Sequence, residues 1–344
     1  MKKILLLFIV WFLLFQCFDV NAQTKKVQVK NGWMEDNLKG KVKSIKTIFY
    51  VAIDTSGKVH KGKLRYSKFV NYDNTGKEME HYFYNPDVNL RPKTTYKYDS
   101  NENLIEENCY DRDDSLLSKI IYKYNSKAKI IEKNENGILD LNTFYKYDSI
   151  GNQIEEKTCS SDNSFCWKTT FKYDNKGNQI EVNVYNSDGS LARNNNYKYD
   201  SSGNQIEEDH RRTIGGKIIE KSKTKYSCNG HKIEKSVYKI INGYKIFRRP
   251  RLGLDYTTTT QYDSTGNKIE IKVYNPNGRL NRKITYKYND KGNQIEENRY
   301  QSDGRLKGSD TFIYEFDKNG NWIQLIEYIE GKPEEITERE IEYY

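Results

Sequence analysis

The chain has 344 residues, with 57 Lys or Arg against 48 Asp or Glu, so its formal net charge at pH 7 is +9. Charged residues of both signs make up 31% of it. A surplus spread in this way indicates a solvated surface more than a nucleic-acid-binding footprint, so we expect no nucleic acid partner. The 29 tyrosines supply large apolar bodies with polar tips, which favours a folded protein over a disordered one.

The first 22 residues predict a secretory signal. Lys2 and Lys3 precede an unbroken apolar run over 4–15, and Val-Asn-Ala at 20–22 supplies small residues at the cleavage positions. The run is shorter than the roughly 20 residues that a membrane-spanning helix needs. We therefore expect cleavage before Gln23 and a periplasmic, secreted or cell-surface associated protein that is not integral to a membrane.

A lipoprotein is the alternative at this terminus. Cys17 would then become the acylated first residue. Phe15 and Gln16 are bulky where a lipobox has small residues, so the cleaved, soluble form is favoured.

One segment of about 26 residues is repeated along the chain. In the copy at 197–208 it begins Tyr-Lys-Tyr-Asp-Ser-Ser-Gly-Asn-Gln-Ile-Glu-Glu, and we number positions from the second tyrosine, the anchor, as 0. The anchors are Tyr72, Tyr98, Tyr124, Tyr147, Tyr173, Tyr199, Tyr226, Tyr262, Tyr288 and Phe316. A fixed period of this length indicates a repeat architecture, in which one supersecondary unit stacks on copies of itself.

The repeat predicts antiparallel hairpins. Asp at +1 and Gly at +4 are typical of a type I turn, and a second turn signal follows around positions such as 186–189. The segments between turns alternate in polarity and show no helical period. The residues that should anchor the repeats are Tyr147, Tyr173, Tyr199, Tyr262 and Tyr288, with Gly151, Gly177, Gly203, Gly266 and Gly292 in the turns and Ile154, Ile180, Ile206, Ile269 and Ile295 at +7.

Parity predicts the pairing within each hairpin. If the tyrosine at 0 and the isoleucine at +7 share a buried face, Tyr199 pairs with Ile206 and Lys198 faces Glu207. The same register sets Lys146 against Glu155, Lys172 against Glu181 and Lys287 against Glu296. One face would then be apolar and the other a solvated lattice of Lys and Glu.

These patterns predict an all-β fold, a repetitive antiparallel meander of about 20 strands in one large twisted sheet. At about 4.8 Å per strand such a sheet would be roughly 100 Å wide if flat, so we expect it to coil on itself. Residues 23–70 would be N-terminal capping strands, 71–327 the repeats and 328–344 a closing strand.

The motif Tyr-x-Tyr-Asp-x-x-Gly-Asn-x-Ile resembles the YD repeat of RHS-type bacterial surface proteins and toxin shells, over about residues 70–325. The resemblance implies hairpin strips that spiral into a shell, sometimes around a toxin domain. This chain is shorter than such shells and carries no non-repeat domain after the repeats, which argues against a closed cocoon and a toxin cargo.

Two groups of residues are candidates for binding. Tyrosine recurs at +12, on the face opposite the anchor, and Tyr185, Tyr274 and Tyr300 could contact a glycan or a protein partner. The alternative is that each packs over its own hairpin edge. Arg248, Arg249 and Arg251 form a basic insertion, which is either a contact for an anionic partner or a tolerated surface loop.

Cys159 and Cys166 flank a predicted hairpin end, where a cross-strand disulfide and two free or differently paired thiols are both open. The spacing of the cysteines fits no zinc site, and the histidines at 60, 81, 210 and 231 are scattered. We expect no catalytic residues, no metal and no cofactor. The sequence favours a non-enzymatic exported module that presents a sheet surface to a glycan or protein, and the alternative is an immunity partner or remnant shell of an RHS-type toxin system.

Overall fold

The computed structural model describes residues 32–35, 37–87, 92–137, 140–214, 217–227, 229–241 and 251–344. The predicted signal peptide, residues 1–22, lies outside the described residues, as does the lipoprotein alternative at Cys17. The described elements are one short helix and 22 strands. They are α2 (Gly32–Glu35), β1 (Val42–Thr55), β2 (Lys58–Tyr72), β3 (Glu78–Tyr84), β4 (Lys93–Tyr98), β5 (Leu104–Tyr110), β6 (Leu116–Tyr124), β7 (Ile130–Asn136), β8 (Leu141–Tyr147), β9 (Gln153–Ser160), β10 (Cys166–Tyr173), β11 (Gln179–Tyr185), β12 (Leu191–Tyr199), β13 (Gln205–Ile214), β14 (Lys217–Tyr226), β15 (Lys232–Ile241), β16 (Arg251–Tyr262), β17 (Lys268–Tyr274), β18 (Leu280–Tyr288), β19 (Gln294–Gln301), β20 (Leu306–Phe316), β21 (Trp322–Ile329) and β22 (Lys332–Tyr343).

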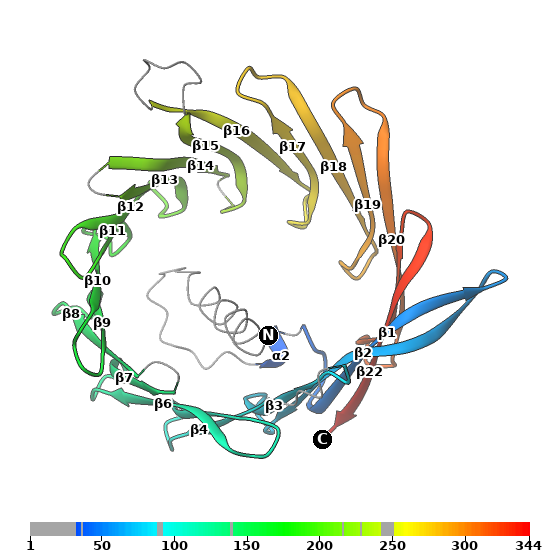
Figure 1. Ribbon diagram of the computed structural model, residues 1–344, viewed down its shortest axis with the longest axis horizontal. Helices are drawn as coiled ribbons and strands as arrows, with labels where there is room; N and C mark the ends of the chain where they lie inside the picture. The colour runs from blue at the N-terminus through cyan, green and yellow to red at the C-terminus, as the bar shows by residue number, and fades with distance from the viewer. Residues whose placement is uncertain are drawn as a thin grey trace.

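The strands form one closed antiparallel ring. Each strand pairs with the next along the chain, and β22 also pairs with β1, with Ile45 opposite Ile341 and Phe49 opposite Thr337 (Figure 1). The predicted all-β meander is confirmed. The expected sheet of about 20 strands coiling on itself is replaced by a 22-stranded barrel, because the long first and last strands pair and so leave neither as an exposed edge.

The predicted turn chemistry is confirmed, and the turn after β12 is representative. The Gly203 amide donates to the Asp200 carbonyl at 3.1 Å, and Gly203 has the left-handed φ of 85° that a residue without Cβ adopts readily. The Asp200 carboxylate accepts from the amides of Ser202 at 2.9 Å and Asn204 at 2.8 Å. Aspartate at +1 therefore holds the turn through its own side chain.

The charge register is confirmed, whereas the pairing of the anchor with the isoleucine is wrong. Lys198 lies opposite Glu207, with its Nζ 3.0 Å from the carboxylate, but Tyr199 lies opposite Gln205. The register shifts between these pairs, because a β-bulge places an extra residue, Ile206, beside the anchor. The other three predicted pairs also form, Lys146–Glu155 at 2.7 Å, Lys172–Glu181 at 2.8 Å and Lys287–Glu296 at 2.9 Å.

The bulge also changes the burial of the isoleucines at +7. Ile154 and Ile206 are each 38% exposed, so the prediction that they belong to a packed core is wrong. Ile180, Ile269 and Ile295 are half-buried. The reason is that a bulged residue leaves the regular alternation that the parity argument assumed.

Six of the anchor tyrosines join their repeat to the one before it. The Tyr199 hydroxyl donates to the carbonyl of Gln179 at 2.7 Å, and Gln179 is the +6 residue of the preceding repeat. The same bond recurs from Tyr98 to Glu78, Tyr124 to Leu104, Tyr147 to Ile130, Tyr173 to Gln153 and Tyr288 to Lys268. The repeat therefore uses tyrosine here for a hydrogen bond between neighbouring hairpins as well as for its apolar ring.

Replacing an anchor hydroxyl is expected to weaken the ring. Tyr199→Phe keeps the aromatic ring and leaves the Gln179 carbonyl without its donor, and a bond of this kind contributes about 0.5–1.5 kcal/mol to the free energy of unfolding. Urea melts would measure the loss. Tyr185→Phe on the opposite face is the matched control, and we expect a change within about 0.5 kcal/mol. Equal losses in the two variants would contradict the role of this bond.

The face that carries the anchors lines the inside of the ring. The segment containing α2 lies inside the ring in Figure 1, and Trp33 and Leu38 pack against Val42, Ile45, Val70 and Tyr72 of the sheet. The Trp33 indole also donates to the Val42 carbonyl at 2.7 Å. Because cross-strand partners share a face, the inner face can be followed around the whole ring from these residues.

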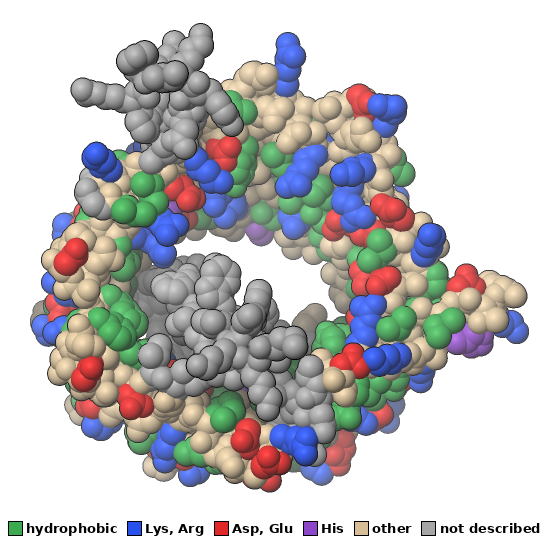
Figure 2. Space-filling view, viewed as in Figure 1, with side chains coloured by type: hydrophobic (Ala, Val, Ile, Leu, Met, Phe, Trp, Pro, Cys, Tyr) green, Lys and Arg blue, Asp and Glu red, His purple; other side chains and the backbone are tan. Residues whose placement is uncertain are grey.

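The outer face carries the Lys and Glu lattice. Lys146, Lys172 and Lys198 have side chains 66–68% exposed. Figure 2 shows charged side chains of both signs around the outside of the ring and an opening at its centre. The outer face is therefore charged, as expected. The inner face, which was expected to be apolar, also carries many polar groups.

Candidate binding surfaces

The inner wall of the ring exposes aromatic side chains. Tyr66, Phe83 and Trp167 are 36%, 39% and 36% exposed. All three lie on the inner face, because they share it with Val70 through the pairs Lys68↔Phe83 and Phe49↔Tyr66 and through the ladder that leads to Thr158↔Trp167. Exposed aromatic rings on a concave surface are typical of binding sites for sugars, peptides and other ring-stacking ligands.

Cross-strand pairs of tyrosine and glutamate also line this inner wall. The tyrosine at −2 lies opposite the glutamate at +9 in the pairs Tyr96↔Glu107, Tyr145↔Glu156, Tyr197↔Glu208 and Tyr286↔Glu297. Hydroxyls reach these carboxylates from neighbouring strands, from Tyr122 to Glu107 at 2.6 Å and from Tyr226 to Glu208 at 2.8 Å. Burial raises the pKa of Glu156 above its ordinary value. The wall therefore offers both acceptors and aromatic faces to a ligand.

None of these inner-wall residues is among the binding candidates predicted from the sequence. The predicted register places the glutamate at +8 on the charged face and assigns no partner to the glutamate at +9. The same parity puts +9 and −2 on the anchor's face, so the alternation of Tyr and Glu there could have been found by listing that face repeat by repeat. What the alternation could not show is that this face lines an opening.

Two glutamates oppose each other on the inner wall, next to the pairing of β22 with β1. Glu327 pairs directly with Glu335, and Arg65 binds Glu335 at 3.2 Å. Burial, and then the charges of Glu335 and Asp310, raise the pKa of Glu327. The ionised form of Glu327 is therefore disfavoured in the folded protein.

Removing this charge is expected to stabilise the ring at neutral pH. The penalty of a raised carboxyl pKa is present above the folded pKa and is lost as the pH falls through it. Glu327→Gln should therefore raise the free energy of unfolding at pH 7 by about 0.2–1 kcal/mol, the range for cross-strand charge pairs, and the gain should vanish in acid. Thermal melts between pH 4 and pH 8 would measure it.

Glu296→Gln is the control of opposite sign. The hydrogen bonds that Lys287 and Asn298 donate to Glu296 lower its pKa, so its charge is favoured in the folded protein. This variant should lose stability at neutral pH, and the loss should shrink as the pH falls through the folded pKa. A destabilised Glu327→Gln at pH 7 would show that the opposed carboxylates are not repulsive.

The tyrosines predicted to bind a partner lie on the outer face. Tyr185 lies opposite Lys168 and Tyr300 opposite Lys283, with the lysine Nζ 5.3 Å and 4.4 Å from the ring centroids. Tyr274 lies opposite Thr257. All three tyrosines are half-buried, so each packs partly over its own sheet and also keeps an accessible part.

The arginine insertion cannot be placed in a site. Arg248 and Arg249 lie outside the described residues, and Arg251 begins β16. Cys159 and Cys166 are cross-strand partners in β9 and β10, and the structure joins them in a disulfide with their Cα atoms 4.1 Å apart.

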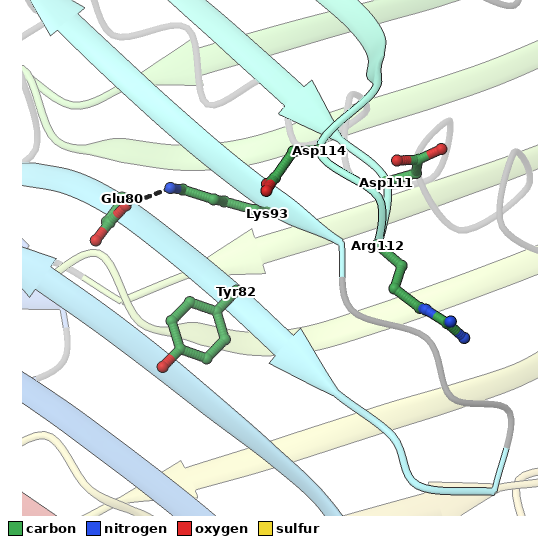
Figure 3. A pocket seen from close by; sticks show the side chains of 6 residues that line it. All are labelled: Glu80, Tyr82, Lys93, Asp111, Arg112 and Asp114. Atoms are coloured by element: carbon green, nitrogen blue, oxygen red, sulfur yellow. Dashed lines mark ion pairs between the residues drawn. The ribbon is translucent and has the colours of Figure 1, made fainter.

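A depression of about 300 Å³ lies on the outer face beside β3 and β4 (Figure 3). Glu80, Tyr82 and Lys93 line it from the strands, with Asp111, Arg112 and Asp114 from the turn after β5. Lys93 forms an ion pair with Glu80 at 3.1 Å, drawn in Figure 3. Three carboxylates and two cationic groups nearly balance there, so we assign no ligand to it.

Within the described ranges, no group of three or more His, Cys, Asp or Glu side chains is arranged to hold a metal ion. No helix in the same part of the chain has the length and apolar character needed to cross a membrane.

Comparison with known proteins gives only weak likenesses. No family model matches the chain, and no curated protein matches it. Among solved structures, a crystal structure of TcdB2-TccC3-TEV is 14% identical, with a TM-score of 0.36, over 79% of this chain and 15% of that one. TcdB2-TccC3 without its hypervariable C-terminal region is 11% identical, with a TM-score of 0.29, over 82% of this chain and 20% of that one.

A porin-like protein from Bacteroides uniformis is 9% identical, with a TM-score of 0.30, over 88% of this chain and 98% of that one. The chain thus spans a fifth or less of the two TcdB2-TccC3 chains. Scores this low carry no argument about function. The fold and surfaces themselves define the class, a closed antiparallel repeat barrel with a polar and aromatic inner wall.

Proposed function

We propose that this chain is a non-enzymatic exported binding module whose ring receives a glycan or protein partner against its inner wall. Export rests on the signal sequence read at residues 1–22. The observation that carries the binding role is the set of accessible aromatic rings, Tyr66, Phe83 and Trp167, on the concave face of a ring with a central opening (Figure 2).

The character of the wall supports this role. Concave surfaces with aromatic rings and a few placed polar groups are where ligands bind most often. The inner wall has both, since carboxylates such as Glu107 and Glu208 lie among tyrosines. The wall also already accepts an aromatic side chain of the chain itself, because Trp33 packs on it and donates to Val42.

The proposal includes the finer assignment of the repeats to the YD type of RHS proteins. The motif quoted above supports it, together with the turn that Asp200 and Gly203 build after β12. A remnant shell, or an immunity partner of an RHS-type toxin, is the second candidate. The closed ring favours the remnant shell within that pair, and a toxin gene beside this one would support either.

The test is a binding screen with the mature chain, from Gln23 onward. A glycan array and cross-linking pull-downs would find a ligand, and the double variant Tyr66→Ala/Trp167→Ala would locate it. We expect the inner-wall variant to lose at least tenfold in affinity. The matched control is Tyr82→Ala/Tyr110→Ala, which removes two aromatic rings from the outer face, opposite Phe69 and Lys93, and should retain binding.

Two results would overturn the proposal. Retention of affinity in the inner-wall variant, with loss in the outer-face control, would move the site to the outside of the ring. Turnover of any compound in a broad substrate screen would contradict the non-enzymatic role.

A further inference from the structure

Two lysines face each other directly on the outer surface of the β9–β10 hairpin. Lys157 and Lys168 are cross-strand partners, and both are exposed. Within the described part of the chain, neither lysine forms an ion pair, and Glu155, two residues away on the same face, is already paired with Lys146 at 2.7 Å. Like charges directly opposite in a sheet are destabilising, so this pair carries an electrostatic cost in the folded protein.

An aromatic ring completes a row with the two lysines. Lys168 also lies opposite Tyr185 of β11, and its Nζ is 5.3 Å from the ring centroid. Lys157, Lys168 and Tyr185 therefore lie side by side across three neighbouring strands. The two ammonium groups and the half-buried ring form one short line. This line attracts an anion and repels a further cation.

The hairpin that carries the lysines is covalently fixed. The disulfide between Cys159 and Cys166 joins the cross-strand pair two places along each strand from Lys157 and Lys168, on the same outer face. A cross-link so close to the pair limits how far the two strands can separate in response to the repulsion. The lysines are therefore held together before any ligand arrives, which lowers the ordering cost of binding.

The same row recurs on another part of the ring. Lys272 of β17 lies opposite Lys283 of β18, and Lys283 lies opposite Tyr300 of β19 with its Nζ 4.4 Å from the ring. These residues occupy the same repeat positions as the first row, so both rows lie at the same height on the outer face. Lys272 differs in having an ion pair with Glu270 at 2.6 Å.

We propose that the row of Lys157, Lys168 and Tyr185 binds the acidic group of an anionic polysaccharide, and that the Lys272, Lys283 and Tyr300 row is a second, weaker contact for the same polymer. Paired lysines recognise a carboxylate or sulfate by charge, and tyrosine suits the adjoining sugar ring, because it has an apolar body and a polar tip. Repetition of the row fits a polymer whose acidic groups also repeat. This inference concerns the outer face and goes beyond the inner-wall function proposed above.

The test measures binding of the mature chain to polygalacturonate, dextran sulfate and uncharged dextran, with polyglutamate as an acidic polypeptide. We expect binding to one or both acidic polysaccharides and none to dextran. The double variant Lys157→Ala/Lys168→Ala should lose at least tenfold in affinity. The control Lys146→Ala/Lys198→Ala removes the same charge from exposed, paired lysines of the outer face and should lose less than twofold.

The tyrosine distinguishes a glycan from other polyanions. Tyr185→Ala should weaken polysaccharide binding by at least threefold and leave any polyglutamate binding unchanged. Equal losses in the two lysine double variants would show an unspecific electrostatic effect and overturn the proposal. Polyglutamate binding as tight as polysaccharide binding, with no effect of Tyr185→Ala, would overturn it in favour of an acidic peptide.

The inner-wall variant Tyr66→Ala/Trp167→Ala separates this proposal from the preceding one. It should bind the acidic polysaccharides as the unmodified chain does, whatever the outcome of the inner-wall screen. Thermal melts of every variant would show that losses of affinity do not come from unfolding.

Discussion

Removal of residues 332–344, which include β22, is expected to abolish the folded ring. β22 covers β1 over nine paired positions, and it contributes the buried side chains Ile336 and Thr337, each 3% exposed. Without it, β1 and β21 become open edges with unpaired amides and carbonyls, which readily pair with other chains. We expect loss of the cooperative thermal transition and aggregation, measured by circular dichroism and by size-exclusion chromatography with light scattering.

A shortened β1–β2 hairpin is the control for this truncation. The tip of that hairpin projects away from the ring in Figure 1, and Ile53 within it is 48% exposed. Replacing residues 53–60 by a two-residue turn removes part of two strands and leaves the pairing with β22 in place. This variant should remain monomeric and melt cooperatively. A truncated chain without β22 that does the same would show that closure is dispensable.

Tyr72→Ala is expected to be the most damaging single substitution. Tyr72 is 1% exposed and lies in the cluster of Val42, Ile45 and Val70, where Gly32 of the inner segment approaches its ring. Loss of a buried aromatic side chain costs about 3–5 kcal/mol of the free energy of unfolding, because a cavity remains. Denaturant melts would give the value.

Tyr72→Phe separates the ring from the hydroxyl. This variant keeps the ring and its packing, so the loss should stay within about 1.5 kcal/mol, the contribution of one hydrogen bond. If the alanine variant is no less stable than the phenylalanine variant, the segment around Trp33 does not depend on the packing of this ring. Amide exchange near Trp33 would show whether the segment has detached from the wall.

Much of the fold could be predicted from the sequence because each repeat carries its own local signals. Asp200 and Gly203 specify the turn by side-chain hydrogen bonding and a left-handed backbone, which any single copy reveals. Lys198 and Glu207 specify the charge register in the same local way. The position of Ile206 was mispredicted because a bulge is a departure from alternation, and alternation was the only rule available.

Closure and the site could not be predicted in the same way. The pairing of Ile45 with Ile341 joins residues at the two ends of the described chain, and no local pattern encodes contact at that distance. Whether a face is concave depends on that closure, so the tyrosines and glutamates of the inner wall could be assigned to one face but not recognised as the lining of an opening. The lysine row was missed because Lys157 and Lys168 face each other only through the register across the disulfide-linked hairpin.

The alternating direction of the strands restricts how such a protein can evolve. In a ring of antiparallel neighbours the last strand can pair antiparallel with the first only if the number of strands is even, as the 22 here is. Gene duplication or deletion must therefore add or remove whole hairpins. Each event would change the circumference, and with it the width of the central opening, while the height of the wall stays constant. Homologues with different repeat numbers should then differ in the size of the molecule that the central opening can admit. The number of repeats would therefore set the width of the opening.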